Sequence, residues 1–228
     1  IQKMLIKKAN LKGIPVITAT QMLLSMTQNE RATRAEISDV ANAVLDGTDV
    51  VMLSEESAVG EDPINVVDTM HNIIAKTEDI YNFDKRYKFP YLDEFDVIQA
   101  TVTKLADDLK ANGILAITSS GKSALKMSRY RPRTPIFTFT HKKKVLNSLT
   151  AIWGVEPIGT IKEAQASKMF QKMLKSLDEI GKLKKDGLYV ATVGYPVGMP
   201  GSTNTIKILT PSEIEYYLNF KEKDKKAK

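Results

Sequence analysis

The chain of 228 residues contains no cysteine and only two histidines. Without thiols it can form neither a disulfide framework nor a thiolate metal centre, and its composition is compatible with a reducing compartment. Two histidines alone also argue against a zinc site. No apolar run approaches the roughly 20 residues that a membrane-spanning helix needs, and the first residues form an amphipathic pattern rather than a signal peptide. We therefore expect a cytoplasmic protein with no membrane partner.

Aromatic side chains are sparse, at 7% of the residues, although the formal charge of +6 is basic. Nucleic-acid binding usually combines basic groups with stacking aromatics, and the lysines and arginines here are not interleaved with them. Part of the positive excess lies in residues 221–228, which mix acidic residues with lysines as a solvated tail does. The sequence therefore disfavours nucleic acid as a partner and favours phosphorylated small molecules.

Two short apolar segments in the first third of the chain end in hydroxyl residues at matching places. Thr20 follows a strand candidate at residues 15–19, and Ser54 follows another at residues 49–53. A threonine or serine after a strand is, taken alone, more often a turn former than a catalytic residue. The segment between the strands decides whether the two hydroxyls can lie together.

That intervening segment has the start and stop signals of a helix. Thr33 followed by Glu36 forms a capping box, and Gly47 occupies the position where a left-handed residue usually ends a helix. Strand, helix and strand at this spacing predict a parallel crossover. In barrels of such units, the side chains just beyond the carboxyl ends of the strands line the active site. Thr20 and Ser54 are therefore candidate site residues.

The pattern divides the chain into residues 1–84, residues 85–220 and the charged tail, residues 221–228. The first section alternates helix and strand and amounts to about a quarter of an eight-stranded TIM-type (βα) barrel. The second predicts an open, mostly parallel α/β sheet with helices on both faces and an edge strand at residues 205–209. Strands of a partial barrel keep exposed edges unless another chain or segment pairs with them. Because Ile1 lies inside a helical pattern, we expect a fragment of a longer protein.

A second polar cluster follows one of the predicted strands of the second section and opens a helix. Backbone N–H groups at a helix start, several hydroxyls and one lysine favour an anion site. It is not a Walker loop, because the first glycine of that pattern is replaced by Ala116. An ordinary serine-rich helix N-cap explains the same residues and remains the alternative. The cluster consists of Thr118, Ser119, Ser120, Gly121, Lys122 and Ser123.

Several longer motifs follow one another in an order that resembles the pyruvate kinase family, and they cover nearly the whole chain. A chance match to all of them is far less expected than a match to one short pattern. There are departures: Glu55 stands where most members carry glycine, Val59 where many carry a lysine that contacts nucleotide, and residues 28–32 replace a usually proline-containing loop. The motifs are ATQML (19–23), TRAE (33–36), SDVANAVLDG (38–47), MLS with Glu56 (52–56), ATV (100–102), SSGKSA (119–124), RPRTPI (131–136), WGV (153–155) and GSTNTIKI (201–208).

The resemblance implies a glycolytic enzyme that transfers a phosphoryl group from phosphoenolpyruvate to ADP, giving pyruvate and ATP, with Mg²⁺ and K⁺ as cofactors. In the family, the metal ligands, the catalytic lysine and a substrate-binding arginine lie upstream of the matched part. This chain should therefore contain no metal ligand and be inactive alone. Thr20 matches the threonine implicated in protonating the enolate, and Ser54 lies near that proton path. Gln21, Arg34 and Glu56 are expected on the substrate or subunit rim, although a solvated helix face explains Arg34 equally well.

The resemblance also implies a regulatory role for the second section. In members that respond to sugar phosphates, the loop matching residues 118–123 holds an effector phosphate, and a glycine-rich segment at residues 194–204 folds over it. Gly198, Gly201 and Ser202 are therefore expected in this effector loop. The predicted helix at residues 162–180 lacks the tryptophan and arginine that bind a sugar bisphosphate. A monophosphorylated sugar or AMP is at least as well supported, and an unregulated enzyme remains open.

The oligomeric state is a further expectation from the resemblance. Family members form homotetramers through both the barrel helices and the regulatory domain, so at least the regulatory contact should survive in this chain. The alternative interpretation is a stand-alone, non-catalytic module that binds a phosphate effector or dimerises. Whether the gene continues upstream of Ile1 separates the two interpretations.

Overall fold

The computed structural model describes residues 1–83, 88–163, 165–194 and 203–221, and the chain divides into two units. The first unit comprises Ile1–Pro90 together with Ala151–Trp153, and the second comprises Tyr91–Thr150 and Gly154–Lys228. The sequence placed the boundary at residue 84 and did not separate the three residues around Trp153. Gly198, Gly201 and Ser202, expected in the effector loop, all lie outside the described residues, as does most of the tail.

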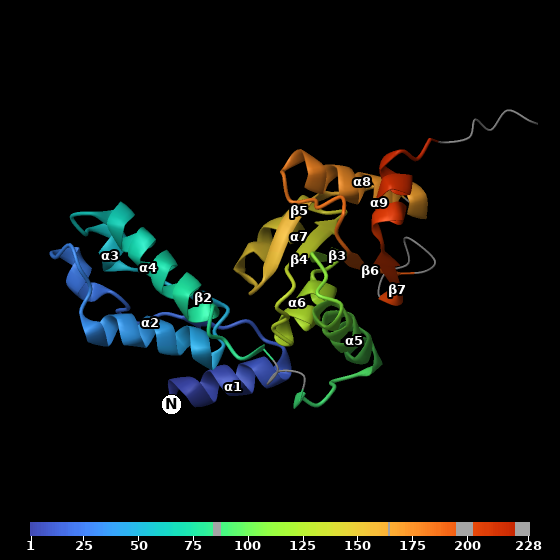
Figure 1. Ribbon diagram of the computed structural model, residues 1–228. Helices are drawn as coiled ribbons and strands as arrows, with labels where there is room; N and C mark the ends of the chain where they lie inside the picture. The colour runs from blue at the N-terminus through green and yellow to red at the C-terminus, as the bar shows by residue number, and fades with distance from the viewer. Residues whose placement is uncertain (84–87, 164, 195–202, 222–228) are drawn as a thin grey trace, which may run out of the picture. The chain divides into compact units, whose positions relative to one another are not determined.

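The first unit consists mainly of helices and contains one very small parallel sheet (Figure 1). The two strands pair Ile17 with Val50 and Thr18 with Val51, so their carboxyl ends lie at the same edge. This confirms the predicted parallel crossover, although each strand is shorter than predicted. The elements are α1 (Gln2–Lys12), β1 (Ile17–Thr18), the 3-10 helix η1 (Leu24–Thr27), α2 (Arg34–Asp46), β2 (Val50–Val51), α3 (Glu55–Ala58) and α4 (Pro63–Glu78).

The predicted start and stop signals fix the long helices of this unit. The Thr33 hydroxyl accepts a hydrogen bond from the Glu36 N–H, the Glu36 carboxylate accepts one from the Thr33 N–H, and Gly47 ends α2 with φ of 93°. Asp62 caps α4 by accepting from the Asn65 N–H. These local bonds satisfy donors that a helix start otherwise leaves without partners.

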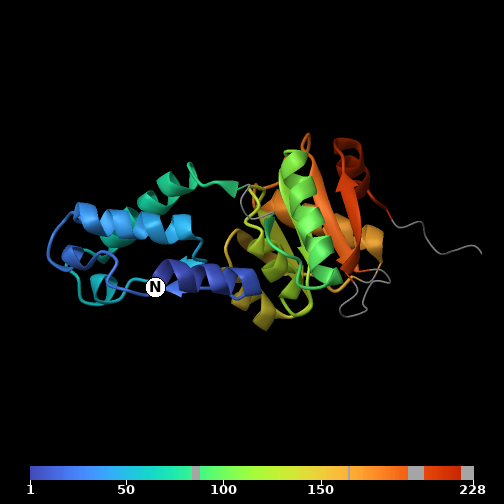
Figure 2. The same ribbon diagram turned by 90° about the horizontal axis from the view of Figure 1, so that it is seen from below.

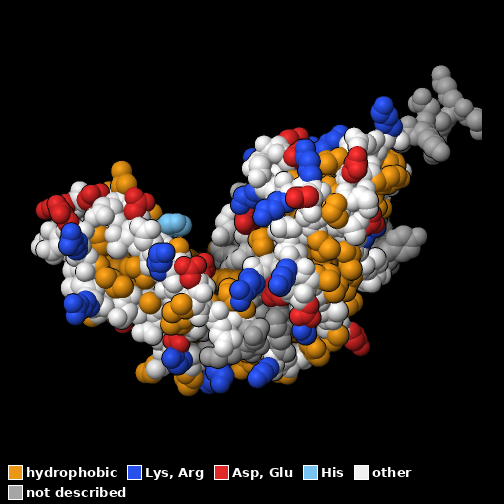
Figure 3. Space-filling model, viewed as in Figure 1, with side chains coloured by type: hydrophobic (Ala, Val, Ile, Leu, Met, Phe, Trp, Pro, Cys, Tyr) orange, Lys and Arg blue, Asp and Glu red, His pale blue; other side chains and the backbone are white. Residues whose placement is uncertain are grey.

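The core of the first unit is small, and large apolar side chains remain at its surface. Ile17 on β1 is 56% exposed and Val67 on α4 is 51% exposed. Figure 3 shows hydrophobic side chains on the viewed face of this unit. Two short strands are too few to bury the apolar side chains on both faces of the sheet. A partial barrel is expected to leave such side chains exposed. The buried core consists of Met22, Leu23, Met26, Val40, Ala43, Val66 and Met70.

The second unit is a five-stranded sheet in the order β5-β4-β3-β6-β7. Four strands run parallel, and β7 joins the edge beside β6 in the antiparallel direction. The fold class predicted from the sequence is thereby confirmed. The elements are α5 (Glu94–Asp108), β3 (Gly113–Ile117), α6 (Lys122–Arg129), β4 (Ile136–Thr140), α7 (Lys143–Ser148), η3 (Leu149–Ala151), β5 (Val155–Thr160), α8 (Ala166–Glu179), β6 (Tyr189–Gly194), β7 (Thr203–Leu209) and α9 (Pro211–Leu218).

Helices cover both faces of this sheet, with α5 and α6 on one face and α8 on the other (Figure 2). Alternate strand residues point to opposite faces, so Leu115, Phe137 and Phe139 meet Phe170 and Met173 of α8 in one core. Burial of these side chains supplies most of the stabilisation of a sheet of this kind. Within the described parts of the chain, no helix is both long enough and apolar enough to span a bilayer.

Candidate functional site

Thr20 and Ser54 lie at the same edge of the small sheet in the first unit. β1 ends at Thr18 and β2 at Val51. The Met52 N–H donates to the Thr18 carbonyl at 3.0 Å, so the hydrogen bonding between the two strands continues one residue beyond β2. Both side chains are exposed. The structure therefore brings the two predicted hydroxyls to one rim, and both are open to a small molecule.

A buried carboxylate joins the two loops that form this rim. Glu56 is 1% exposed and accepts hydrogen bonds from the Ser54 N–H at 2.7 Å and the Leu23 N–H at 3.3 Å. One residue thus holds the loop after β2 and the loop after β1 together. Carboxylates that accept backbone N–H bonds form strong, charge-assisted contacts. Glu56 positions the rim from below, whereas the sequence had suggested a place on the substrate side.

A second carboxylate, predicted from the sequence only as a helix cap, restrains the same loop. Glu36 accepts from the Ser25 N–H at 2.7 Å and from the Ser25 hydroxyl at 2.5 Å, in addition to its bonds with Thr33. Partial burial raises the pKa of Glu36, but the hydrogen bonds from Ser25 and Thr33 outweigh burial and lower the pKa below its ordinary value. Glu36 is therefore ionised and holds the loop at neutral pH.

The remaining predicted rim residues are at the surface. Gln21 is exposed directly after Thr20, and Arg34 is exposed in the first turn of α2. The Arg34 carbonyl accepts from the Ser38 hydroxyl at 2.9 Å, a contact of the helix backbone that leaves the guanidinium group at the surface. Both positions fit either a partner contact or a solvated face.

The predicted anion loop of the second unit is shaped by its own threonine. Thr118 is 3% exposed, and its hydroxyl accepts from the Gly121 N–H at 2.9 Å. Gly121 has φ of 87°, and a Cβ at this position would lie 3.3 Å from Leu149 Cδ2. A residue with a side chain would be strained in this conformation. Thr118 and Gly121 therefore shape the loop, and Thr118 points into the protein rather than towards a ligand.

The outward side of this loop keeps fewer donors than the sequence suggested. Ser120 and Lys122 are exposed and Ser119 is partly exposed, all next to the N-terminus of α6. Ser123 is 5% exposed, and its hydroxyl lies 3.4 Å from that of Thr203 at the start of β7. An anion at this loop would therefore meet Ser119, Ser120 and Lys122 together with N–H groups of the first helical turn.

Groups of three or more carboxylate, imidazole or thiolate side chains that could hold a metal ion are absent from the part of the chain that the structure describes. Mg²⁺ is usually bound through carboxylates and substrate phosphates. The described residues therefore do not fit a resident Mg²⁺ site.

Comparison with known proteins places these features in a family. A family model described as "Pyruvate kinase, alpha/beta domain" matches residues 96–209, and one described as "Pyruvate kinase, barrel domain" matches residues 1–67. A pyruvate kinase of Clostridium acetobutylicum is 42% identical over 212 residues, covering 91% of this chain and 45% of the relative. A pyruvate kinase of Geobacillus stearothermophilus is 41% identical over 218 residues, covering 94% of this chain and 37% of the relative.

A solved structure agrees with these relatives. The crystal structure of a pyruvate kinase from Cryptosporidium parvum superposes with a TM-score of 0.82 at 33% sequence identity. The match covers 92% of this chain and 42% of that structure. The chain thus spans less than half the length of each of these relatives.

Proposed function

Because this chain belongs to the pyruvate kinase family, we propose that it is part of an enzyme that transfers a phosphoryl group from phosphoenolpyruvate to ADP, giving pyruvate and ATP. In this proposal the first unit contributes the last βα units of the catalytic barrel, and the second unit binds an effector and contacts other subunits. The cytoplasm, where glycolysis takes place, is the expected location. The single observation that carries the proposal is the exposed pair Thr20 and Ser54 at the carboxyl edge of two parallel strands.

The chemistry proposed for this rim is proton delivery to the enolate of pyruvate. A threonine hydroxyl is far too weak an acid to act unaided, so Thr20 would donate a hydrogen bond or pass a proton along a water chain. Ser54 would continue that chain on the neighbouring loop. Glu56 and Glu36 would serve as positioning residues, because their bonds to Ser54, Leu23 and Ser25 fix the loops.

Mg²⁺ and K⁺ belong to the proposal as cofactors of the whole enzyme, with ligands supplied by other parts of it. They would neutralise the transferring phosphoryl group, which is the main task in reactions of this type. This chain alone should therefore not turn over. A coupled assay of pyruvate formation from phosphoenolpyruvate and ADP, run on the 228-residue chain and on the whole natural protein, tests this expectation.

The two interpretations give different results in that assay. Turnover by the whole protein and none by the chain supports the proposal. Robust turnover by the chain alone would show that the upstream residues are dispensable. The alternative, a non-catalytic module that binds a phosphate effector or dimerises, requires that the whole natural protein also be inactive.

The second part of the proposal is an effector phosphate at the loop formed by residues 118–123. Its support is the inward Thr118 hydroxyl, which shapes the loop, and the outward Ser120 and Lys122 beside the start of α6. A sugar monophosphate or AMP fits this single anion site. The effector loop expected at residues 194–204 lies mostly outside the described residues. The same unit would carry a contact between subunits, giving a tetramer in the whole enzyme.

Replacing Lys122 with alanine should weaken phosphate binding by at least about tenfold, because hydrogen bonds to charged groups contribute roughly 1.5–3 kcal/mol. Calorimetry with inorganic phosphate, AMP and a sugar monophosphate measures the effect on the whole protein. Lys144→Ala, an exposed lysine on α7 outside the loop, is the matched control. Binding that is absent, or indifferent to Lys122→Ala, would remove the loop as an effector site.

A further inference from the structure

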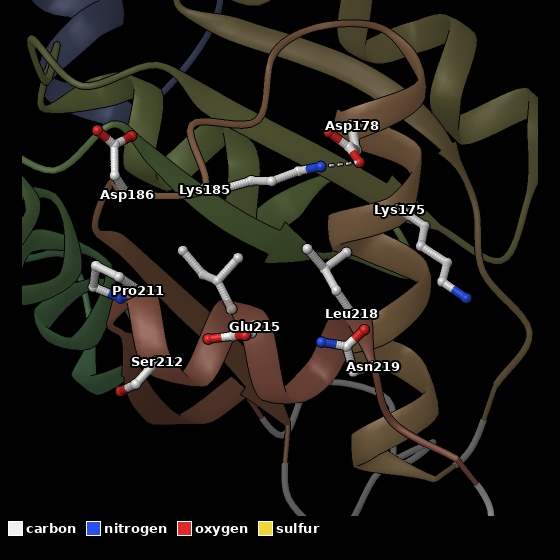
Figure 4. A pocket seen from close by; sticks show the side chains of 10 residues that line it. Lys175, Asp178, Lys185, Asp186, Pro211, Ser212, Glu215, Leu218 and Asn219 are labelled. Carbon is white, nitrogen blue, oxygen red and sulfur yellow. Dashed lines mark ion pairs between the residues drawn. The ribbon is translucent and has the colours of Figure 1, made fainter.

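The largest difference between the charged groups of the two units is how far water surrounds them. In the second unit, Lys185 and Asp178 form an ion pair beside the hollow between α8 and α9 (Figure 4), and their side chains are 63% and 41% exposed. Such a pair contributes little to stability. In the first unit, by contrast, the carboxyl group of Glu78 is partly buried beside the indole of Trp153. Burial makes the charge of such a group costly.

The indole ring of Trp153 lies in a small aromatic cluster of the first unit. Its centroid is 6.2 Å from that of Tyr81 and 6.3 Å from that of Phe83, and the rings of Tyr81 and Phe83 meet edge-on at 5.1 Å. Separations of this size are those of favourable aromatic pairs. Tyr81 is 7% exposed, so the cluster has a buried side. Aromatic packing therefore holds the ring of Trp153.

A carboxylate holds the backbone of the same residue. Asp49 accepts from the Trp153 N–H at 3.3 Å with Oδ1 and from the Val16 N–H at 2.9 Å with Oδ2. Val16 directly precedes β1 and Asp49 directly precedes β2. The Asp49 carboxylate thus ties residue 153 to the start of the small parallel sheet.

The chain leaves the first unit directly after Trp153. Gly154 has φ of 67°, a left-handed conformation that favours glycine. Its carbonyl accepts from the N–H of Ile136, the first residue of β4, at 3.0 Å. Residues 151–153 are therefore a short excursion of the chain, with residues of the second unit on both sides.

Glu78 provides the third hold on Trp153 from the last position of α4. The indole N–H is the only donor of the tryptophan side chain, so the Glu78 carboxyl group accepts from it. Burial raises the pKa of Glu78, the bond from Trp153 lowers it, and the charges of Asp79 and His71 raise and lower it further. The net result is a pKa above the ordinary value of 4.5. Among the described residues, Asp49 is the other charged group that contacts Trp153.

The direction of this pKa shift fixes the effect of a proton. A raised pKa means that Glu78 binds a proton more tightly beside Trp153 than when it is fully solvated, so protonation favours the closed arrangement. That advantage is fully present below pH 4.5 and is lost as the pH rises through the raised pKa. A protonated carboxyl group still accepts the indole N–H through its carbonyl oxygen. Protonation therefore removes the cost of burying the charge and keeps the bond.

We propose that the side chains around Trp153 form a proton-sensitive clasp, which holds residues 151–153 on the first unit and loosens when Glu78 ionises. The clasp consists of Asp49, Glu78, Tyr81 and Phe83. Acidification closes it and high pH loosens it. Because residues 150 and 154 belong to the second unit, the clasp sets how firmly that part of the chain is anchored to the first. The clasp requires no substrate, so it is independent of the proposed catalytic role.

NMR on the 228-residue chain tests the contact, because Trp153 is the only tryptophan and its indole N–H gives a single signal. That signal should shift as Glu78 titrates, with a midpoint above 4.5. In Glu78→Gln, which keeps the side-chain volume and carries no charge, the transition should be absent. His71→Gln should keep the transition and move its midpoint upwards, since the charge of His71 lowers the pKa of Glu78. An indole signal that does not titrate, or that titrates equally in Glu78→Gln, overturns the proposal.

Hydrogen exchange of the Trp153 backbone N–H, the donor to Asp49, measures how firmly the clasp holds. Its protection factor, which corrects for the intrinsic effect of pH on exchange, should rise as the pH falls from about 8 to about 5, by up to about tenfold for each unit of pKa difference between the closed and open arrangements. Glu78→Gln should show no such rise. Asp68→Asn, an exposed carboxylate of α4 outside the clasp, is the matched control and should keep it. Circular dichroism checks that each variant is folded. A rise that persists in Glu78→Gln, or none in the parent chain, would refute the clasp.

Discussion

On the proposed function, Thr20→Val in the whole natural protein is expected to lower kcat by roughly a hundredfold, the lower end of what general acid–base groups contribute. Valine keeps the β-branched shape and removes only the hydroxyl, which is exposed at the rim. Because the loop is held by Glu56 and Glu36, which do not touch the Thr20 side chain, the rim should keep its shape. The KM for phosphoenolpyruvate should therefore change little.

Two measurements separate a role in proton transfer from a role in substrate positioning. The coupled assay gives kcat and KM, and exchange of the pyruvate methyl protons with D₂O, followed by NMR, reports the proton step without phosphoryl transfer. Both kcat and the exchange rate should fall together. Thr101→Val, the same chemical change at an exposed position of α5, is the control. Unchanged exchange in Thr20→Val would exclude Thr20 from the proton path.

Arg129→Met is expected to destabilise the second unit by about 3–5 kcal/mol, the usual cost of leaving one charge of a buried ion pair alone. The Arg129 guanidinium donates to Asp96 at 2.7 Å, and both side chains are fully buried. The same carboxylate oxygen accepts from the Tyr130 hydroxyl at 2.9 Å and the Leu92 N–H at 2.8 Å. Burial first, and then the bond to Asp96, raise the pKa of Tyr130, so its phenol stays a neutral donor.

Hydrogen exchange of the β3 and β6 amides measures this loss in the second unit itself, which matters because a two-unit chain need not unfold in one step. Lys104→Met on α5 is the control: it removes the Lys104–Asp108 pair, whose side chains are 58% and 62% exposed, and should cost under about 1 kcal/mol. The double variant Asp96→Asn with Arg129→Met should recover part of the loss. Equal effects of Arg129→Met and Lys104→Met would mean that the buried pair stabilises no more than a surface pair.

Local signals in the sequence predicted most of this fold. Thr33 with Glu36, and Gly47, marked helix ends that the structure confirms, because caps depend on residues three or four positions apart. α9 was missed although it carries the same signals: Thr210, then proline at the first helical position, then Glu213. The helix is short and directly follows the last predicted strand, so it was not predicted although its start signals are present in the sequence.

The contacts that hold the rim could not be predicted in the same way. Glu56 meets Leu23, which lies 33 residues away in the chain, and Glu36 meets Ser25, 11 residues away. Such bonds depend on how the strand loops come together, and no spacing rule encodes them. Thr118 was likewise predicted as a ligand residue from its type, whereas burial turned it inward to accept from Gly121. Sequence thus located the loops, and only packing decided which side chains face outward.

The assignment of Ala151–Trp153 to the first unit determines where the chain can be cut into fragments that each keep one unit whole. The chain passes from one unit to the other at residue 90, again at 150 and again at 153, so a single proteolytic cut after Pro90 leaves two covalent links intact. Trp153 donates its N–H to Asp49 at 3.3 Å and lies 6.2 Å from the Tyr81 ring. A fragment that starts at Tyr91 would therefore carry an indole stripped of its neighbours. The sequence contains a single indole. The tryptophan fluorescence of such a fragment would therefore report whether Trp153 has lost its neighbours in the first unit, and so whether residues 151–153 belong to that unit.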